Sequence, residues 1–151
     1  MRVLNAIFGL LIGGAFAFGG VQIALETAVP TYQSWESMQS WQATTATLLT
    51  VSGSSNNSEA SYRYTVSGLD YNNDRVYVSA VKDNIGSYHQ EMVKQLNWLK
   101  DNHQAVDIWY DPDNPHDSVI DRNMRWGFFA FNVGFCSIFI IIGLGIFYAS
   151  I

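Results

Sequence analysis

WGFFAFNVGFCSIFIIIGLGIFYASI, residues 126–151, is the stretch that decides the fold, because it contains no charged side chain. A helix of this length crosses a hydrocarbon core of about 30 Å, since each residue adds about 1.5 Å. Such a helix satisfies its own backbone hydrogen bonds, as the interior of a membrane requires. The sequence therefore predicts a transmembrane helix over residues 127–149.

A second apolar stretch begins the chain. After Arg2 no charged residue occurs until Glu26, so we expect a transmembrane helix over residues 3–25. A cleaved signal peptide is the rival interpretation, because a basic residue, an apolar run and Ala15-Phe16-Ala17 resemble its three regions. The apolar run continues well beyond that tripeptide, which favours a helix that is retained.

Small residues recur at spacings of three or four on both apolar stretches, where they let two helices approach closely. They are Gly9, Gly13 and Ala17 on the first stretch, and Gly127, Ala130 and Gly134 on the second. Asn132 should face the other helix or the membrane interface, because an unpaired amide is costly in lipid. We expect the two faces to pack together within one chain; packing between copies, giving a homo-oligomer, is the alternative.

The region between the apolar stretches is acidic. Residues 26–125 contain all thirteen acidic residues and seven of the eight basic ones, a net charge of about −6. Nucleic-acid binding needs a basic face that displaces counterions, and docking onto anionic headgroups needs basic residues too. The sequence therefore predicts no nucleic-acid partner, and it favours a basic protein as the partner of this region.

Residues 30–42 predict a juxtamembrane helix. Pro30 suits the first turn, and Tyr32, Trp35, Met38 and Trp41 follow at roughly helical spacing. Aromatic residues just outside a membrane span commonly anchor it at the interface. We expect this face to lie on lipid headgroups or on the following domain; an aromatic cage for a ligand is the alternative.

Residues 43–121 predict a small β-rich domain. The runs 43–51, 61–67 and 75–79 are rich in β-branched or aromatic residues, and they indicate an antiparallel meander, with the polar residues 52–58 as its first turn.

Residues 87–102 predict an amphipathic helix on the sheet, with Ser87 as its N-cap and His89 exposed. A further strand carries Val106, Ile108 and Tyr110 on one face. The predicted fold class is membrane α+β: two transmembrane helices flank a small antiparallel sheet with one amphipathic helix.

A set of residues in this domain follows a recognisable order. It comprises Tyr62, Tyr64, Val66, Gly68, Tyr71, Arg75 and Val76, and then Val106, Ile108, Tyr110, Asp111, Pro112, Asn114, Pro115 and Ser118. The order resembles a bacterial family called the domain of unknown function 3592 family, whose members place a small β-rich domain between two membrane helices.

The resemblance covers residues 41–118, although the insertion at residues 87–102 is longer than the family leads us to expect. It implies architecture and bacterial origin and adds no active site. We interpret the motif residues as structural.

No motif for chemistry is apparent. The histidines, His89, His103 and His116, lack the spacing of metal ligands. The acidic turn at residues 111–117 departs from a calcium loop, which needs glycine at its sixth position and glutamate at its twelfth, so we interpret its acids as turn caps. Nucleophile and phosphate-loop motifs are missing, and the single cysteine, Cys136, is interpreted as a packing residue. We expect no metal, no cofactor and no catalytic residue.

Orientation and function remain hypotheses. Arg2 precedes the first span, which favours cytoplasmic termini and a periplasmic domain at a bacterial inner membrane, while Arg122 and Arg125 count against it. The first functional hypothesis is a non-enzymatic membrane-anchored module that binds another protein, as an immunity or envelope accessory protein would. The alternative is a structural or accessory subunit that assembles with a membrane complex or transporter through its spans.

Overall fold

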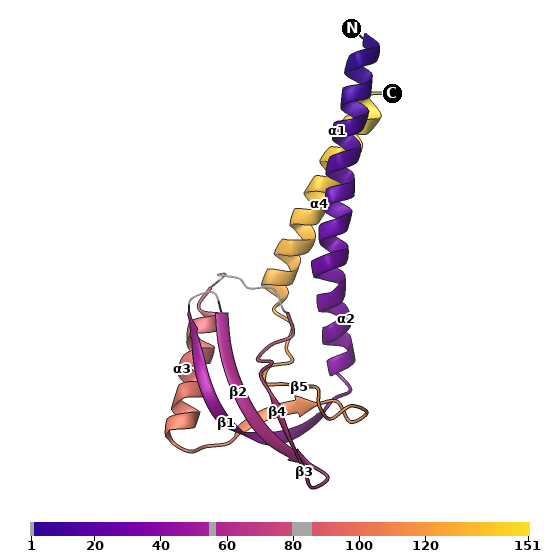
Figure 1. The fold of residues 1–151 in the computed structure, drawn as a ribbon. Coiled ribbons are helices and arrows are strands. Elements are labelled where there is room, and N and C mark those ends of the chain that lie inside the picture. Colours follow the sequence, from indigo (N-terminus) through magenta and orange to yellow (C-terminus); the bar gives the residue numbers. More distant parts are fainter. Residues whose placement is uncertain (1, 55–56, 80–85) are drawn as a thin grey trace. The chain divides into compact units, whose positions relative to one another are not determined.

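The computed structural model describes residues 2–54, 57–79 and 86–151, and the chain divides into two units (Figure 1). Met1–Tyr32 and Arg125–Ile151 form the first unit, called the helical pair below. Gln33–Met124 form the second, called the sheet unit.

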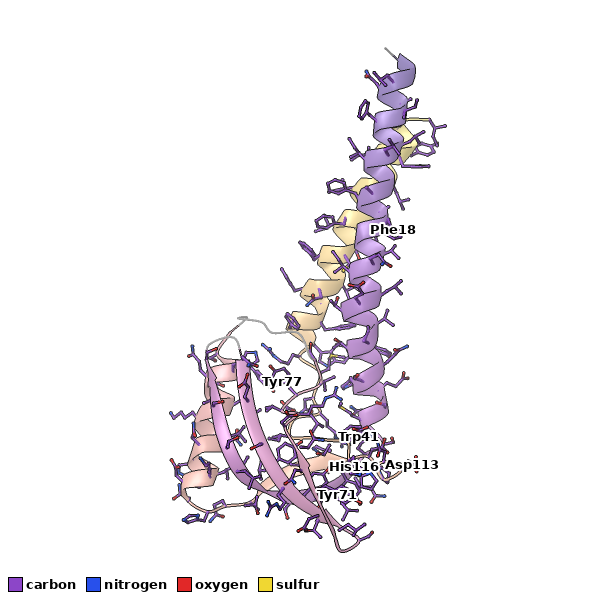
Figure 2. The ribbon with its side chains drawn as sticks, viewed as in Figure 1. Phe18, Trp41, Tyr71, Tyr77, Asp113 and His116 are labelled. Atoms are coloured by element: carbon purple, nitrogen blue, oxygen red, sulfur yellow. The ribbon has the colours of Figure 1, made fainter. Side chains whose placement is uncertain are left out.

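The helical pair exposes most of its apolar surface. Its helices are α1 (Arg2–Ile23), the π-helical turn η1 (Ala24–Ala28), the start of α2 (Val29–Met38), and α4 (Trp126–Ala149). Phe18 on α1 is 67% exposed and Ile141 on α4 is 68% exposed, and Figure 2 shows Phe18 on the helix surface. Two helical segments, Leu4–Met38 and Trp126–Ala149, are long and apolar enough to cross a membrane.

Glycines bring the backbones of α1 and α4 into contact. A Cβ atom added to Gly143 would lie 2.4 Å from the Ala17 nitrogen and 2.6 Å from the Gly13 oxygen. Further along, a Cβ on Gly20 would lie 2.9 Å from the Cys136 oxygen, and Cys136 is itself buried. Because low residue numbers on α1 meet high ones on α4, the two helices run antiparallel.

Helix α4 does not pack on α1 through the small-residue face that the sequence predicts, which is Gly127, Ala130 and Gly134. Ala130 is exposed, and a Cβ on Gly127 or Gly134 would meet nothing within 4 Å. In this part of α4 an aromatic pair makes the contact: the Phe129 and Tyr32 ring centroids are 6.3 Å apart. Bulky rings keep the backbones apart here, so the close approach occurs further along α4, at Cys136 and Gly143.

The amide of Asn132 is paired within its own helix. Its Nδ2 donates to the Phe128 oxygen at 3.0 Å, and the residue is half-buried. The polar group therefore needs no partner from α1.

A wider helical turn precedes Pro30. The Val29 N–H donates to the Ala24 oxygen, five residues back, so η1 holds one residue more than a regular turn. Proline lacks an N–H, and in a regular helix its ring clashes with the carbonyl four residues earlier. The π-helical turn lets the helix continue through this position.

The described residues of the sheet unit form five antiparallel strands in the order β3-β2-β1-β4-β5. They are β1 (Gln42–Ser54), β2 (Asn57–Val66), β3 (Leu69–Asn73), β4 (Val106–Tyr110) and β5 (Ser118–Val119). Helix α3 (Tyr88–Asp101) packs on β1 and β2. Together with the two helices able to span a membrane, this arrangement confirms the predicted fold class.

The main core lies between α3 and one face of the sheet. Leu48, Tyr62 and Ile108 point inward from three neighbouring strands, and Leu96 covers them from α3. The register of β1 against β2 shifts at Leu49, because Leu48 pairs with Tyr62 and Thr50 already pairs with Ser61. This bulge changes which residues of β1 face inward, and beyond it Val51 packs on the core.

A second apolar cluster lies on the Trp109 side of the sheet unit. Met38 and Trp41 pack with Val78 and Val119, and Trp35 and Trp109 lie against them. The residues of α2 that lie in the sheet unit therefore place their apolar face on the domain.

The third strand differs from the sequence expectation. Ser67 and Gly68 have positive φ values of 52° and 82°, which makes a two-residue hairpin turn, and β3 begins directly at Leu69. The expected strand at residues 75–79 forms only an isolated parallel bridge between Tyr77 and Asp121.

In the first turn, the pairing of β1 with β2 extends to Ser54 and Asn57, and residues 55–56 lie outside the described residues.

Of two expectations about α3, the N-cap position of Ser87 is confirmed and the exposure of His89 is wrong. Ser87 occupies the N-cap position, but its hydroxyl bonds the Glu91 carboxylate instead of a backbone N–H. His89 is 1% exposed, because it points toward the start of β2, where its Nδ1 lies 2.9 Å from the Ser58 hydroxyl.

The close approach at Gly143 generates a prediction. Gly143→Val should destabilise the helical pair by about 1–3 kcal/mol, because the new side chain cannot fit against the α1 backbone. Thermal unfolding of the full chain in detergent measures the effect. Gly134→Val is the matched control and should change little, since its Cβ meets nothing within 4 Å. Equal effects of the two substitutions would contradict this packing.

Candidate functional site

The hydroxyl of Tyr62 joins three segments of the sheet unit. It donates to the Arg75 oxygen at 3.0 Å and lies 3.0 Å from the Ser118 hydroxyl. Tyr62 and Ser118 are both fully buried. Burial raises the pKa of the Tyr62 hydroxyl far above its ordinary value, while the hydrogen bond with Ser118 acts in the opposite direction. The phenol therefore stays neutral and keeps its proton for the bond to Arg75.

Tyr64 makes a parallel connection two residues along β2. Its hydroxyl donates to the Pro115 oxygen at 2.6 Å, and burial raises its pKa. Next to it, the Tyr71 ring from β3 stacks on Tyr64. The Tyr71 and His116 rings meet nearly at right angles, with centroids 4.9 Å apart, and Figure 2 labels both residues. The aromatic side chains of β2 and β3 thus hold the turn that precedes β5.

That turn, residues 111–117, is closed by its own polar groups. The Asp111 carboxylate accepts the Asp113 N–H at 2.9 Å, and the Asp111 N–H donates to the Asp117 oxygen at 2.9 Å. The Asn114 amide donates to the Asp117 carboxylate at 3.0 Å, between Pro112 and Pro115. Short polar side chains and prolines are the residues that stabilise such turns.

Two further motif residues, Gly68 and Tyr110, act at other places in the sheet. Gly68 has a φ of 82° in the β2–β3 turn, a conformation that glycine adopts without strain. Tyr110, at the end of β4, donates its hydroxyl to the Gln42 side chain on β1 at 2.9 Å.

Arg75 is the basic residue of the motif. Its Nε donates to the Tyr77 oxygen at 3.4 Å and its Nη2 to the Val78 oxygen at 2.8 Å, so the side chain folds over its own segment. Desolvation lowers the pKa of its guanidinium, whereas the negative charge of nearby Asp117 acts in the opposite direction.

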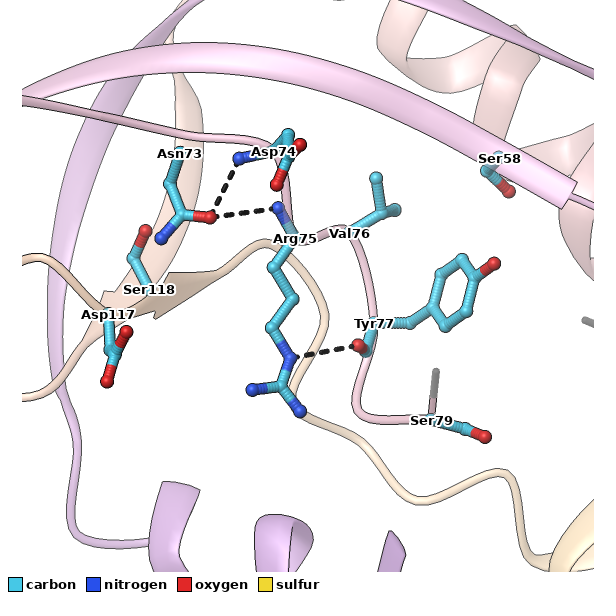
Figure 3. Close-up of a pocket in the computed structure, with 9 residues that line it drawn as sticks. All are labelled: Ser58, Asn73, Asp74, Arg75, Val76, Tyr77, Ser79, Asp117 and Ser118. Carbon is cyan, nitrogen blue, oxygen red and sulfur yellow. Dashed lines mark hydrogen bonds between the residues drawn. The ribbon is translucent and has the colours of Figure 1, made fainter. Parts of the chain in front are cut away.

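A cavity of about 410 Å³ opens beside Arg75 (Figure 3). Its walls come from β2, from the segment that follows β3, and from the start of β5. The lining residues are Ser58, Asn73, Asp74, Arg75, Val76, Tyr77, Ser79, Asp117 and Ser118. The cavity is the candidate functional site of the sheet unit, because it combines a partly desolvated cation with two carboxylates.

Sequence reasoning missed two residues that organise the unit. Arg122 lies over the Trp109 ring, 3.3 Å from its centroid, and its Nη1 donates to the oxygens of Met38 and Gln39 at 3.1 and 3.2 Å. It thus caps the carbonyl end of α2, a role that basic residues play at helix C-termini. His89 is the other, and no spacing in the sequence reveals that its partner is Ser58, 31 positions away.

Metal-ligating side chains do not gather in groups of three or more within the part of the chain that the structure describes. His116 contacts Tyr71, and the carboxylates of Asp111 and Asp117 accept hydrogen bonds from Asp113 and Asn114 in that turn.

Fold and site together define the class: a protein with a small antiparallel sheet domain between two helices able to cross a membrane. The sequence profile of the family described as "Domain of unknown function (DUF3592)" matches residues 41–125, more than half of the chain. The chain belongs to this family. No curated protein and no solved structure is detectably similar to it.

The Tyr62 bridge generates a second prediction. Tyr62→Phe should lower the free energy of unfolding by about 1–3 kcal/mol, because the substitution leaves buried Ser118 and the Arg75 oxygen short of a partner. Denaturant unfolding of the full chain, followed by tryptophan fluorescence, measures the change. Tyr110→Phe is the control and should cost less, since its hydroxyl bonds the exposed Gln42 side chain. A neutral Tyr62→Phe would contradict the bridge.

Proposed function

We propose that the protein is a non-enzymatic membrane protein that presents its sheet unit to a protein partner on the periplasmic side of a bacterial inner membrane. The helical pair would be the anchor. Phe18 and Ile141 each leave about two thirds of their surface uncovered, and lipid is the solvent that favours such exposure.

The observation that carries partner binding is the exposure of Trp98. This side chain lies on α3 and is 60% exposed, in a unit that is otherwise acidic on balance. Tryptophan is among the residues that contribute most to protein interfaces, because one side chain buries a large area at low entropic cost. An exposed tryptophan on an acidic unit fits a partner whose surface is basic and has an apolar pocket that receives Trp98.

The absence of an enzymatic role is part of the same proposal. Most motif residues are engaged in holding the sheet unit together: Tyr62 and Tyr64 bond buried or backbone oxygens, and Asp111 and Asn114 close the turn. Groups used in this way support a scaffold and leave little freedom for proton transfer.

A second candidate is an accessory subunit that assembles with other membrane helices. Gly127, Ala130 and Gly134 favour it, because they are exposed on α4 and untouched by α1. A small-residue face of this kind lets a helix from another chain approach closely.

Site-specific photo-cross-linking in intact bacteria distinguishes the two candidates. A photoreactive residue at Trp98 should form an adduct with a protein identified by mass spectrometry, and one at exposed Thr65 should not. The purified partner should then bind the full chain, and Trp98→Ala should weaken this binding about tenfold or more. Adducts that arise only from a photoreactive residue at Ile141 would overturn the proposal in favour of the accessory subunit.

Orientation has its own test. The antiparallel helical pair places both termini on one side if both helices cross the membrane. In a Cys136→Ser background, a single cysteine at exposed Asp113 should react with a membrane-impermeant maleimide in intact cells, and one at Ile151 should react only after lysis. The reverse pattern would place the sheet unit in the cytoplasm.

A further inference from the structure

The cavity beside Arg75 has free charge of both signs. Among the described residues, Nε and Nη2 of Arg75 are bonded to carbonyl oxygens, and no acceptor bonds its Nη1. No hydrogen bond within the described chain engages the carboxylate of Asp74, and Asp117 accepts only from the Asn114 amide at its Oδ2. All three residues line the cavity (Figure 3).

The other polar groups on the wall are already engaged. The Asn73 carbonyl oxygen accepts the N–H groups of Asp74 and Arg75, at 2.7 and 3.1 Å, and its Nδ2 donates to the His116 oxygen. Ser118 is bonded to Tyr62, and Ser58 to His89. The unused hydrogen-bonding capacity of the wall is therefore one guanidinium edge and two carboxylates.

The balance of these charges restricts the chemistry of a ligand. A simple anion would pair with Arg75 but would be repelled by Asp74 and Asp117, and a simple amine would pair with a carboxylate but leave the free edge of Arg75 without a partner. A molecule that carries a carboxylate and an ammonium group a few ångströms apart pairs with both signs. A cavity of about 410 Å³ has room for such a small molecule, since ligand sites commonly measure about 300–1,000 Å³.

We infer that this cavity binds a zwitterionic α-amino acid. Arg75 Nη1 donates to the ligand carboxylate, and Asp117 and Asp74 accept from the ligand ammonium. Arg75 suits the carboxylate because Nη1 offers its N–H donors on a cation, and charge-assisted bonds of this kind are stronger than neutral ones. The inference concerns a ligand of the sheet unit and does not depend on the proposed protein partner.

Thermal unfolding of the full chain in detergent, with each standard L-amino acid added in turn, tests the inference. At least one amino acid should raise the unfolding temperature, because a ligand that binds only the folded state stabilises it. Its decarboxylated amine and its deaminated acid should not, since each retains one charge only. No shift with any amino acid, or an equal shift with either analogue, would overturn the inference.

Variants separate binding from folding. Asp117→Asn retains an oxygen for the Asn114 amide and should weaken binding of the amino acid, measured by calorimetry, about ten- to a hundredfold. Asp101→Asn makes the same change of charge at an exposed position outside the cavity and should leave binding unchanged. Arg75→Lys keeps the charge and should also weaken binding. Equal affinities of the Asp117→Asn and Asp101→Asn proteins would contradict the site.

Discussion

One buried hydroxyl group, that of Tyr62, connects segments that are distant in the sequence. It lies in the middle of β2 and reaches the Arg75 oxygen on one side and Ser118 of β5 on the other, 13 and 56 positions away. Because β5 is only two residues long, its own ladder to β4 contributes few backbone bonds. The position of β5, and with it one wall of the cavity, therefore depends on side-chain bonds from Tyr62. Because burial keeps the phenol neutral, Tyr62 retains the proton that its hydrogen bond to the Arg75 oxygen requires.

Two arginines of the sheet unit, Arg75 and Arg122, show how a cation is accommodated in a small domain. Arg122 places its guanidinium on Trp109 and bonds the last carbonyls of α2, so its charge meets the negative end of a helix dipole. Arg75 bonds only two carbonyls of its own segment and retains a free edge. This difference explains why Arg122 holds the end of α2 on the sheet unit, whereas Arg75 keeps a free edge that lines the cavity.

Most of the architecture follows from hydrophobic patterning. Uncharged stretches of sufficient length predict the two helices, and alternation predicts the inward faces of Tyr62 and Tyr64 on β2 and of Ile108 on β4, because each pattern reports one element alone. The third strand was misplaced because the Ser67–Gly68 turn is shorter than the polar residues after it suggest.

Features that depend on pairing between elements could not be predicted in this way. The small residues of α1 are evident in the sequence, but which face of α4 meets them depends on where aromatic contacts such as Tyr32–Phe129 hold the helices apart. The burial of His89 depends likewise on Ser58, and the cavity on three segments brought together by Tyr62. The motif residues of the candidate site could be recognised in the sequence, but the cavity between them could not be predicted from it.

At Leu49, the bulge residue of β1, the side chain and the backbone have different roles in the fold. Its side chain is 40% exposed and contributes little to the core, so many side chains would serve there. Its backbone, however, is the extra residue that the bulge absorbs: if residues 48–52 alternated regularly with Leu49 in the ladder, Thr50 and Ser52 would point into the core and Val51 toward solvent. Loss of Leu49 would instead leave Leu48 paired with Tyr62 and Thr50 paired with Ser61, as they are now. Related chains should therefore differ freely in the identity of this residue and should also tolerate its loss. A residue gained or lost in the regularly paired part of β1 would instead exchange the inward and outward faces beyond it.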